Sequence, residues 1–203
     1  MSTRTFDRVS QVTVPEAVFG TAKVERFDVS ETGSQFSGAR EQVPPGQYTR
    51  LVVDGVLCVT DTPADRRDRL ELAVWADRCG AQSALVNGLG LGLAVNALLL
   101  VDTMRYIDVV ELNTDVIALV GPHYEQLAQE HGKAVRIRHG DARPPCRVFP
   151  AGSRWEVVWN DIWSTICADD YEEHKRMRRY YGRLSNWQGV WCGDEVRRLA
   201  TGR

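Results

Sequence analysis

Several features that would place a chain in a familiar class are missing from this sequence of 203 residues. No apolar run reaches the roughly 18 residues that a membrane-spanning helix needs, because three glycines interrupt the stretch that comes nearest, residues 84–95. The first residues include Arg4, Asp7 and Arg8 and lack the apolar core of a signal peptide. We therefore expect a cytoplasmic protein without membrane contact.

Cysteine is scarce and shows no pairing pattern. The five cysteines are odd in number, and no two of them have the spacing of metal ligands. Reduced thiols are the expected state, and no metal site is predicted. The cysteines are Cys58, Cys79, Cys146, Cys167 and Cys192.

The sequence also lacks a large excess of positive or of negative charge. The formal net charge is −2, and only three of the 25 basic residues are lysines. Bulk electrostatics therefore attracts neither nucleic acid nor an anionic membrane. A basic run with aromatics at residues 174–181 could bind a nucleic-acid backbone, but we favour a solvated helix face beside Glu172 and Glu173. A small-molecule substrate is the expected partner.

What the chain does have is a glycine-rich turn. Residues 84–95 predict a strand, a tight turn containing Gly88, Gly90 and Gly92, and an apolar helix. Glycine suits such a turn because the backbone visits positive φ and because an approaching ligand leaves no room for a Cβ atom. Leu93 stands where the dinucleotide fingerprint has its third glycine, which argues against a nicotinamide or flavin. An anion or nucleoside is the expected ligand.

Three further predicted strands also end in polar residues. Residues 106–110 lead to Glu111, residues 134–138 lead to Gly140-Asp141-Ala142, and residues 155–159 lead to Asn160-Asp161. In an open α/β sheet such strand ends line one crevice, where ligands bind. A carboxylate at Glu111 can accept both ribose hydroxyls of a nucleoside.

Taken in order, these four motifs resemble those of class I S-adenosylmethionine-dependent methyltransferases, and within them the spermidine-synthase-like branch. The resemblance covers about residues 51 to 163 and implies a Rossmann-like α/β fold with a mostly parallel sheet. It implies S-adenosylmethionine, or a related adenosyl ligand, as cofactor, with Asp141 accepting from the adenine amino group. The cofactor-binding residues that it implies are Gly88, Gly90, Gly92, Glu111, Leu112, Asp141 and Ala142.

The domain organisation predicted is a small antiparallel β-unit over residues 1–60 and a Rossmann-like domain over residues 61–203. Asp54-Gly55 predicts a type I′ hairpin between two apolar segments. The family's sheet has seven strands, so residues 184–203 leave room only for a C-terminally truncated version. An exposed sheet edge would result, and a homodimer is the expected way to cover it.

The helices expected run from Thr62, as an N-terminal cap, to Cys79 and over residues 91–101, 115–130 and 171–181. Pro122 predicts a kink or a break in the third of these helices. Proline-rich residues 143–154 predict a loop where such folds ordinarily place a helix.

Few residues of the sequence are candidates for a catalytic role. Asp161 is the predicted proton acceptor, Asn160 the group that orients the acceptor substrate, and Trp163 a wall for the substrate. A loop-capping role for Asp161 remains the alternative, while Trp155 and Trp159 are expected in the core.

Methyl transfer to a small molecule or an exposed polar group is the function we favour. Aminopropyl transfer is one alternative, although Cys58 stands where the spermidine synthases have glutamine, and Arg67-Asp68-Arg69 where they have Tyr-His-Glu. A non-catalytic nucleoside-binding or interaction module is the other alternative, so catalysis itself stays open at this point.

Overall fold

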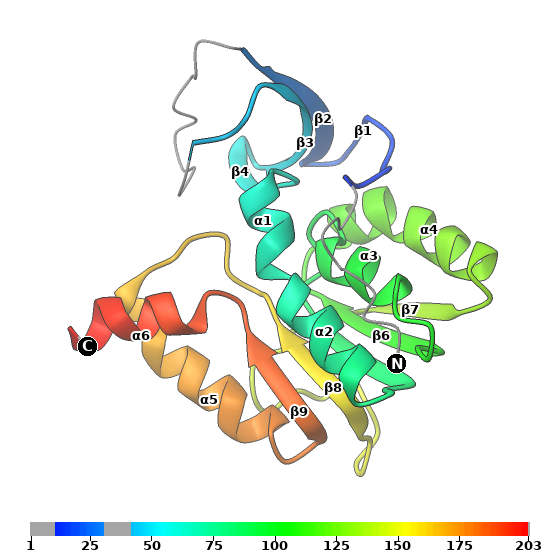
Figure 1. The fold of residues 1–203 in the computed structure, drawn as a ribbon, viewed down its shortest axis with the longest axis vertical. Coiled ribbons are helices and arrows are strands. Elements are labelled where there is room, and N and C mark those ends of the chain that lie inside the picture. Colours follow the sequence, from blue (N-terminus) through cyan, green and yellow to red (C-terminus); the bar gives the residue numbers. More distant parts are fainter. Residues whose placement is uncertain (1–10, 31–41, 203) are drawn as a thin grey trace.

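The computed structural model describes residues 11–30 and 42–202, which form two β-sheets and the helices around them (Figure 1). The first sheet is antiparallel, in the order β1-β2-β3-β4. Its strands are β1 (Ala17–Phe19), β2 (Ala22–Val29), β3 (Gly46–Val53) and β4 (Val56–Thr60).

The second sheet is parallel throughout, in the order β7-β6-β5-β8-β9. Its strands are β5 (Ser83–Asn87), β6 (Tyr106–Glu111), β7 (Ala134–His139), β8 (Trp155–Asn160) and β9 (Ser185–Val190). From β5 the chain adds β6 and β7 on one side of the sheet, and it then returns to add β8 and β9 on the other side of β5. Doubly wound folds show the same reversal of strand order. The predicted Rossmann-like α/β class with an added antiparallel unit is confirmed.

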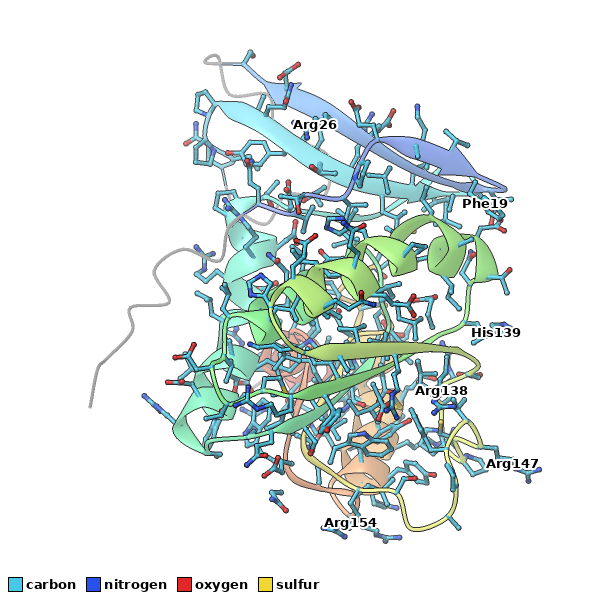
Figure 2. All side chains as sticks on the ribbon, turned by 90° about the vertical axis from the view of Figure 1, so that its right-hand side faces the viewer. Phe19, Arg26, Arg138, His139, Arg147 and Arg154 are labelled. Carbon is cyan, nitrogen blue, oxygen red and sulfur yellow. The ribbon has the colours of Figure 1, made fainter. Side chains whose placement is uncertain are left out.

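Helices cover both faces of the parallel sheet. One face packs against α2 (Leu70–Arg78), α3 (Leu93–Leu99) and α4 (Thr114–Glu130), and the other packs against α5 (Tyr171–Tyr181). Two further helices are α1 (Pro63–Asp68) and α6 (Gly193–Thr201), and a short 3₁₀ helix, η1 (Ala168–Asp170), precedes α5. Figure 2 shows α4 lying between the antiparallel sheet and β7. No helix in the described part of the chain is both long and apolar enough to cross a membrane.

The predicted hairpin joins β3 and β4. Asp54 and Gly55 have φ angles of 52° and 76°, and Val53 pairs with Val56. Two consecutive residues with positive φ define the type I′ turn, whose twist matches that of the flanking strands. The Asp-Gly prediction is therefore confirmed.

Two helix predictions need correction. α4 runs unbroken through Pro122, because Val120 and Tyr124 on either side of the proline are fully buried and hold the helix against the core. The predicted helix beginning at Thr62 is divided into α1 and α2 at Arg69. Thr62 donates its hydroxyl to the Asp65 carboxylate at 2.8 Å, so its side chain does not cap the backbone as predicted.

The antiparallel unit shares its core with the rest of the chain. Val24 and Leu51, each 1% exposed, belong to one buried cluster with Leu72 and Tyr124. At the end of β4 the buried Asp61 carboxylate accepts the backbone N–H of Thr49 at 2.7 Å. Division into two domains at residue 60 stays a prediction, and the shared cluster ties the two parts together.

Candidate functional site

A cavity of about 450 Å³ opens at the carboxyl ends of four parallel strands. Its walls are the turn after β5, the residues after β6 and β7, and residues 161–164 after β8. The antiparallel sheet supplies a largely apolar roof: Leu51, Val53, Cys58 and Val59. The predicted crevice is therefore a cavity closed on one side by the β3–β4 hairpin.

The three glycines of the turn differ in what a Cβ atom at each position would contact. A Cβ atom on Gly88 (φ 94°) would lie 2.0 Å from the Asp161 carbonyl oxygen, and one on Gly92 (φ 76°) 2.0 Å from the Tyr124 ring. These two glycines allow the strand and helix to pack. Gly90 (φ 50°) would meet only a methyl group of Val59, at 3.3 Å. Gly90 and Val59 both line the cavity, so a side chain at position 90 would narrow the cavity there.

Glu111 is held in place by two backbone groups. Its Oε2 accepts the Leu89 N–H at 2.7 Å, and its Oε1 accepts the Asn113 N–H at 2.8 Å. The first bond ties the carboxylate to the glycine turn, and the second ties it to the start of α4. Each oxygen keeps a lone pair for a further donor, so the carboxylate is oriented before a ligand arrives.

Asp141 and Ala142 follow β7 at the other end of the cavity. Asp141 Oδ1 accepts the backbone N–H of Arg143 at 2.9 Å, and its side chain is 51% exposed. The carbonyl of buried Ala142 accepts the Tyr181 hydroxyl at 2.7 Å. Next to them His139, labelled at the end of β7 in Figure 2, places its Nε2 3.1 Å from the Leu112 carbonyl oxygen. These bonds fix the backbone around Asp141.

Asp161 forms a buried ion pair with Arg69. Arg69 donates from Nε to Oδ2 at 2.9 Å and from Nη2 to Oδ1 at 3.1 Å. Burial raises the pKa of Asp161, whereas the Arg69 guanidinium and the Trp159 indole N–H act in the opposite direction. Protonating Asp161 would leave Arg69, itself 3% exposed, with only the more distant Asp68 carboxylate, 3.7 Å from its Nη1, as counterion. Geometry therefore favours the ionised carboxylate.

Asn160 lies away from the cavity. It is fully buried, accepts from Asn87 Nδ2 at 2.8 Å and donates to the Gly189 carbonyl at 2.9 Å. These bonds cross-link β5, β8 and β9 inside the sheet. Of the two side chains predicted to take part in catalysis, the structure brings only Asp161 to the cavity wall.

Trp163 lines the cavity and is held from behind. Its indole N–H donates to Glu173 Oε2 at 2.8 Å, while Glu173 Oε1 accepts from Arg143 Nε at 2.7 Å. The ring lies 4.0 Å from that of His174, measured between centroids. Burial lowers the pKa of His174 to about 4, so this imidazole is neutral at pH 7.

The sequence analysis did not predict two groups of residues that line the cavity. The first is Arg69, whose signal was the Arg67-Asp68-Arg69 run inside an otherwise amphipathic helix. The second is the apolar part of the roof, Leu51, Val53 and Val59, to which the resemblance pointed only as a segment that covers the active site. Within residues 11–30 and 42–202, no three His, Cys, Asp or Glu side chains gather as a metal site would require.

No family model matches this chain, and no curated protein does. Among solved structures, it is similar to the CcbJ methyltransferase from Streptomyces caelestis, with 20% identity, 61% of this chain and 45% of that chain covered, and a TM-score of 0.45. It is also similar to an S-adenosylmethionine-dependent methyltransferase from Clostridium acetobutylicum, with 10% identity, coverages of 60% and 46%, and a TM-score of 0.42. The chain spans about half the length of the solved structures it matches. The likeness concerns the fold.

Proposed function

We propose that the cavity binds S-adenosylmethionine and that the protein transfers a methyl group to a small molecule or an exposed polar group. One observation carries the proposal: the ends of β7, β6, β5 and β8 place Asp141, Glu111, the glycine turn and Asp161 around a single cavity of about 450 Å³. An elongated nucleoside with a charged end matches that sequence of groups.

The fit can be followed residue by residue. Asp141 is half exposed and has a free carboxylate oxygen for the adenine amino group, beside the backbone of Ala142. Glu111 offers both oxygens to ribose hydroxyls, and Leu112 forms part of the wall next to it. Gly90 leaves the turn open for close approach. S-adenosylmethionine, when bound, supplies a methyl group activated by its sulfonium.

The acceptor side would lie between residues 161–164 and the hairpin roof. Trp163 offers a fixed aromatic wall, and the roof is mainly apolar, which suits an acceptor with a planar or apolar body. Asp161 remains the predicted carboxylate of this side. Asn160 has no part in the proposed chemistry, because its side chain is already bonded inside the sheet.

Aminopropyl transfer from decarboxylated S-adenosylmethionine is the second candidate. Its support is the hairpin of the spermidine-synthase-like resemblance, since Leu51, Val53, Cys58 and Val59 do line the cavity. A homodimer that covers the edge of the parallel sheet and a cytoplasmic location belong to the same proposal.

Ligand binding tests the proposal directly. Thermal shifts are measured with S-adenosylmethionine, S-adenosylhomocysteine, methylthioadenosine, NAD and ATP, on the wild type and on Glu111→Gln. An adenosyl ligand at a hundredfold excess over Kd stabilises by about 2.7 kcal/mol, and loss of the Glu111 charge should weaken binding about tenfold or more. Glu125→Gln, on the exposed face of α4, is the matched control. Shifts only with NAD or ATP, or none at all, would refute the proposal.

A further inference from the structure

A second cavity lies at the opposite end of β8 from Asp161. Its volume is about 310 Å³, and it lies between the loop that joins β7 to β8 and the end of α5. Trp155, the first residue of β8, contributes to its wall, as does Leu184, which directly precedes β9. Small-molecule sites begin at about this size, at roughly 300 Å³. The proposed function makes no use of this cavity.

Four aromatic side chains line the second cavity: Phe149, Trp155, Tyr180 and Tyr181. Phe149 and Trp155 meet edge to face with their ring centres 4.7 Å apart, and the two tyrosines do so at 5.0 Å. The indole N–H of Trp155 donates to Asp108 Oδ2 at 2.9 Å. Trp155 and Tyr181 are buried, whereas Phe149 and Tyr180 stay partly exposed. Two rings are therefore accessible to a ligand, and such walls suit a flat, apolar one.

Hydrogen bonds hold the walls of the second cavity in place. The Tyr180 hydroxyl donates to the Cys146 carbonyl at 3.1 Å and so ties the β7–β8 loop to α5. Within the loop the Ser153 hydroxyl donates to the Pro150 carbonyl at 2.8 Å, which closes a turn. A site whose walls are fixed in advance loses little conformational entropy when a ligand binds.

Three arginines surround the second cavity, and Figure 2 labels them near the β7–β8 loop: Arg138, Arg147 and Arg154. Arg147 is exposed and belongs to the lining, and the Arg138 guanidinium lies 5.4 Å from the Phe149 ring centre. Arg154 donates to a backbone carbonyl at 2.8 Å. In the described ranges 11–30 and 42–202, none of the three forms an ion pair with a carboxylate, and no acidic side chain lines the cavity. The cavity therefore combines aromatic walls with positive charge.

We propose that the second cavity binds a small planar aromatic anion, a ring system that carries a carboxylate or a phosphate. The ring packs against Phe149 and Tyr180, and the anionic group faces Arg147, with Arg138 and Arg154 adding to the positive charge. A guanidinium matches both anionic groups because its N–H donors form paired bonds to two oxygens. The inference does not depend on the proposed S-adenosylmethionine site, which lies at the other end of β8.

Calorimetry on the wild type compares ligands that differ in one property. The probes are naphthalene-2-carboxylate, 2-naphthyl phosphate, the neutral naphthalene-2-carboxamide and inorganic phosphate. Both aromatic anions should bind about fivefold or more tightly than the amide, and this preference should shrink at high salt because the arginines are near the surface. Inorganic phosphate should bind at least about tenfold more weakly than 2-naphthyl phosphate, since it has no ring to remove from water.

A triple variant tests the role of the arginines. In Arg138→Gln/Arg147→Gln/Arg154→Gln the preference for the carboxylate over the amide should fall below about twofold, while the amide keeps its affinity within about threefold. The matched control removes the same total charge at exposed positions outside the lining and should keep the wild-type preference. Its changes are Arg78→Gln, Arg105→Gln and Arg176→Gln.

Nuclear magnetic resonance locates the bound ligand. On addition of naphthalene-2-carboxylate the amide signals of Cys146, Phe149 and Ser153 should shift, and those of Gly88 and Gly90 in the first cavity should not. Shifts confined to the glycine turn, or no binding of either aromatic anion, would overturn the inference. So would equal wild-type affinity for the carboxylate and the amide, or an unchanged preference in the folded triple variant. Titrations with adenosyl ligands test the proposed function separately.

Discussion

The Arg69–Asp161 pair makes a strong prediction about stability, independent of any ligand. Arg69→Met leaves the Asp161 carboxylate buried without its counterion, whereas Asp161→Asn leaves the guanidinium with the more distant Asp68 carboxylate, 3.7 Å from Nη1. Removing one partner of a buried pair costs about 3–5 kcal/mol. The double variant, in which neither charge remains, should lose clearly less than the sum of the single losses.

These losses are large for a chain of this size. A free energy of unfolding of about 5–15 kcal/mol is usual for a domain, so either single change would remove a substantial part of it. With a shift of about 2–4 °C in Tm for each kcal/mol, the single variants should melt roughly 6–20 °C lower. Burial already raises the pKa of Asp161, so without Arg69 the carboxyl should take up a proton more readily. The deficit of Arg69→Met should therefore shrink as the pH is lowered.

Urea unfolding followed by tryptophan fluorescence and circular dichroism completes the double-mutant cycle. We expect a coupling energy of about 2 kcal/mol or more between the two positions. Arg143→Met is the matched control, since its pair with Glu173 is more exposed, at 44% and 28%, and should cost less than about 1 kcal/mol. The prediction would be refuted if the losses of unfolding free energy in the two single variants were additive, or if neither loss were larger than that of the control.

Two further predictions concern the glycine turn and the residue behind Trp163. Gly92→Ala should destabilise by more than about 2 kcal/mol in chemical denaturation, because its Cβ atom would lie 2.0 Å from the Tyr124 ring. In Gly90→Ala the new Cβ atom meets only Val59, at 3.3 Å. This change should lower the free energy of unfolding by about 1 kcal/mol, because of the positive φ at position 90, and should weaken ligand binding more strongly than does Gly92→Ala. If Gly90→Ala were the less stable of the two variants, these packing roles would be contradicted. The pKa of His174 lies near 4 in the folded protein, below its usual value of about 6.5, so the unfolded chain binds the proton first as the pH falls. The free energy of unfolding should therefore decrease from pH 6.5 to pH 4, and His174→Gln should flatten that slope in melts recorded across this range.

Local sequence patterns predicted most of the helices, strands and turns because these depend on residues that are close to one another in the sequence. Asp54-Gly55 determines its hairpin through the φ angles of two adjacent residues. The strand end at Glu111 was predictable because an apolar run stops there, and the strand end before Asp141 because the alternation of apolar and polar residues stops at Gly140. Pro122 shows the limit of such rules: the proline removes one helical N–H, but the buried residues around it outweigh that loss.

The chemistry of the site depended on contacts that no local pattern records. Arg69 and Asp161 are 92 positions apart, and each alone is an ordinary charged residue. Asn160 and Asp161 are neighbours in sequence, yet one is bonded inside the sheet and the other turns to the cavity, where the strand has ended. The three alternating glycines are equivalent in sequence, and only the neighbours of Gly88 and Gly92 show that two of them serve packing.

The position of Arg69 also explains why the antiparallel sheet belongs to the site. Arg69 lies between α1 and α2, and α1 follows β4 after the buried Asp61 and Thr62. The strand that roofs the cavity and the helix that delivers the guanidinium are thus one continuous segment. Leu51 in that sheet and Leu72 in α2 belong to one buried cluster, so the roof and the helix share a packed core. The same packing therefore positions the roof and the ion pair, which makes the hairpin a structural part of the cavity and of the ligand site that we propose there.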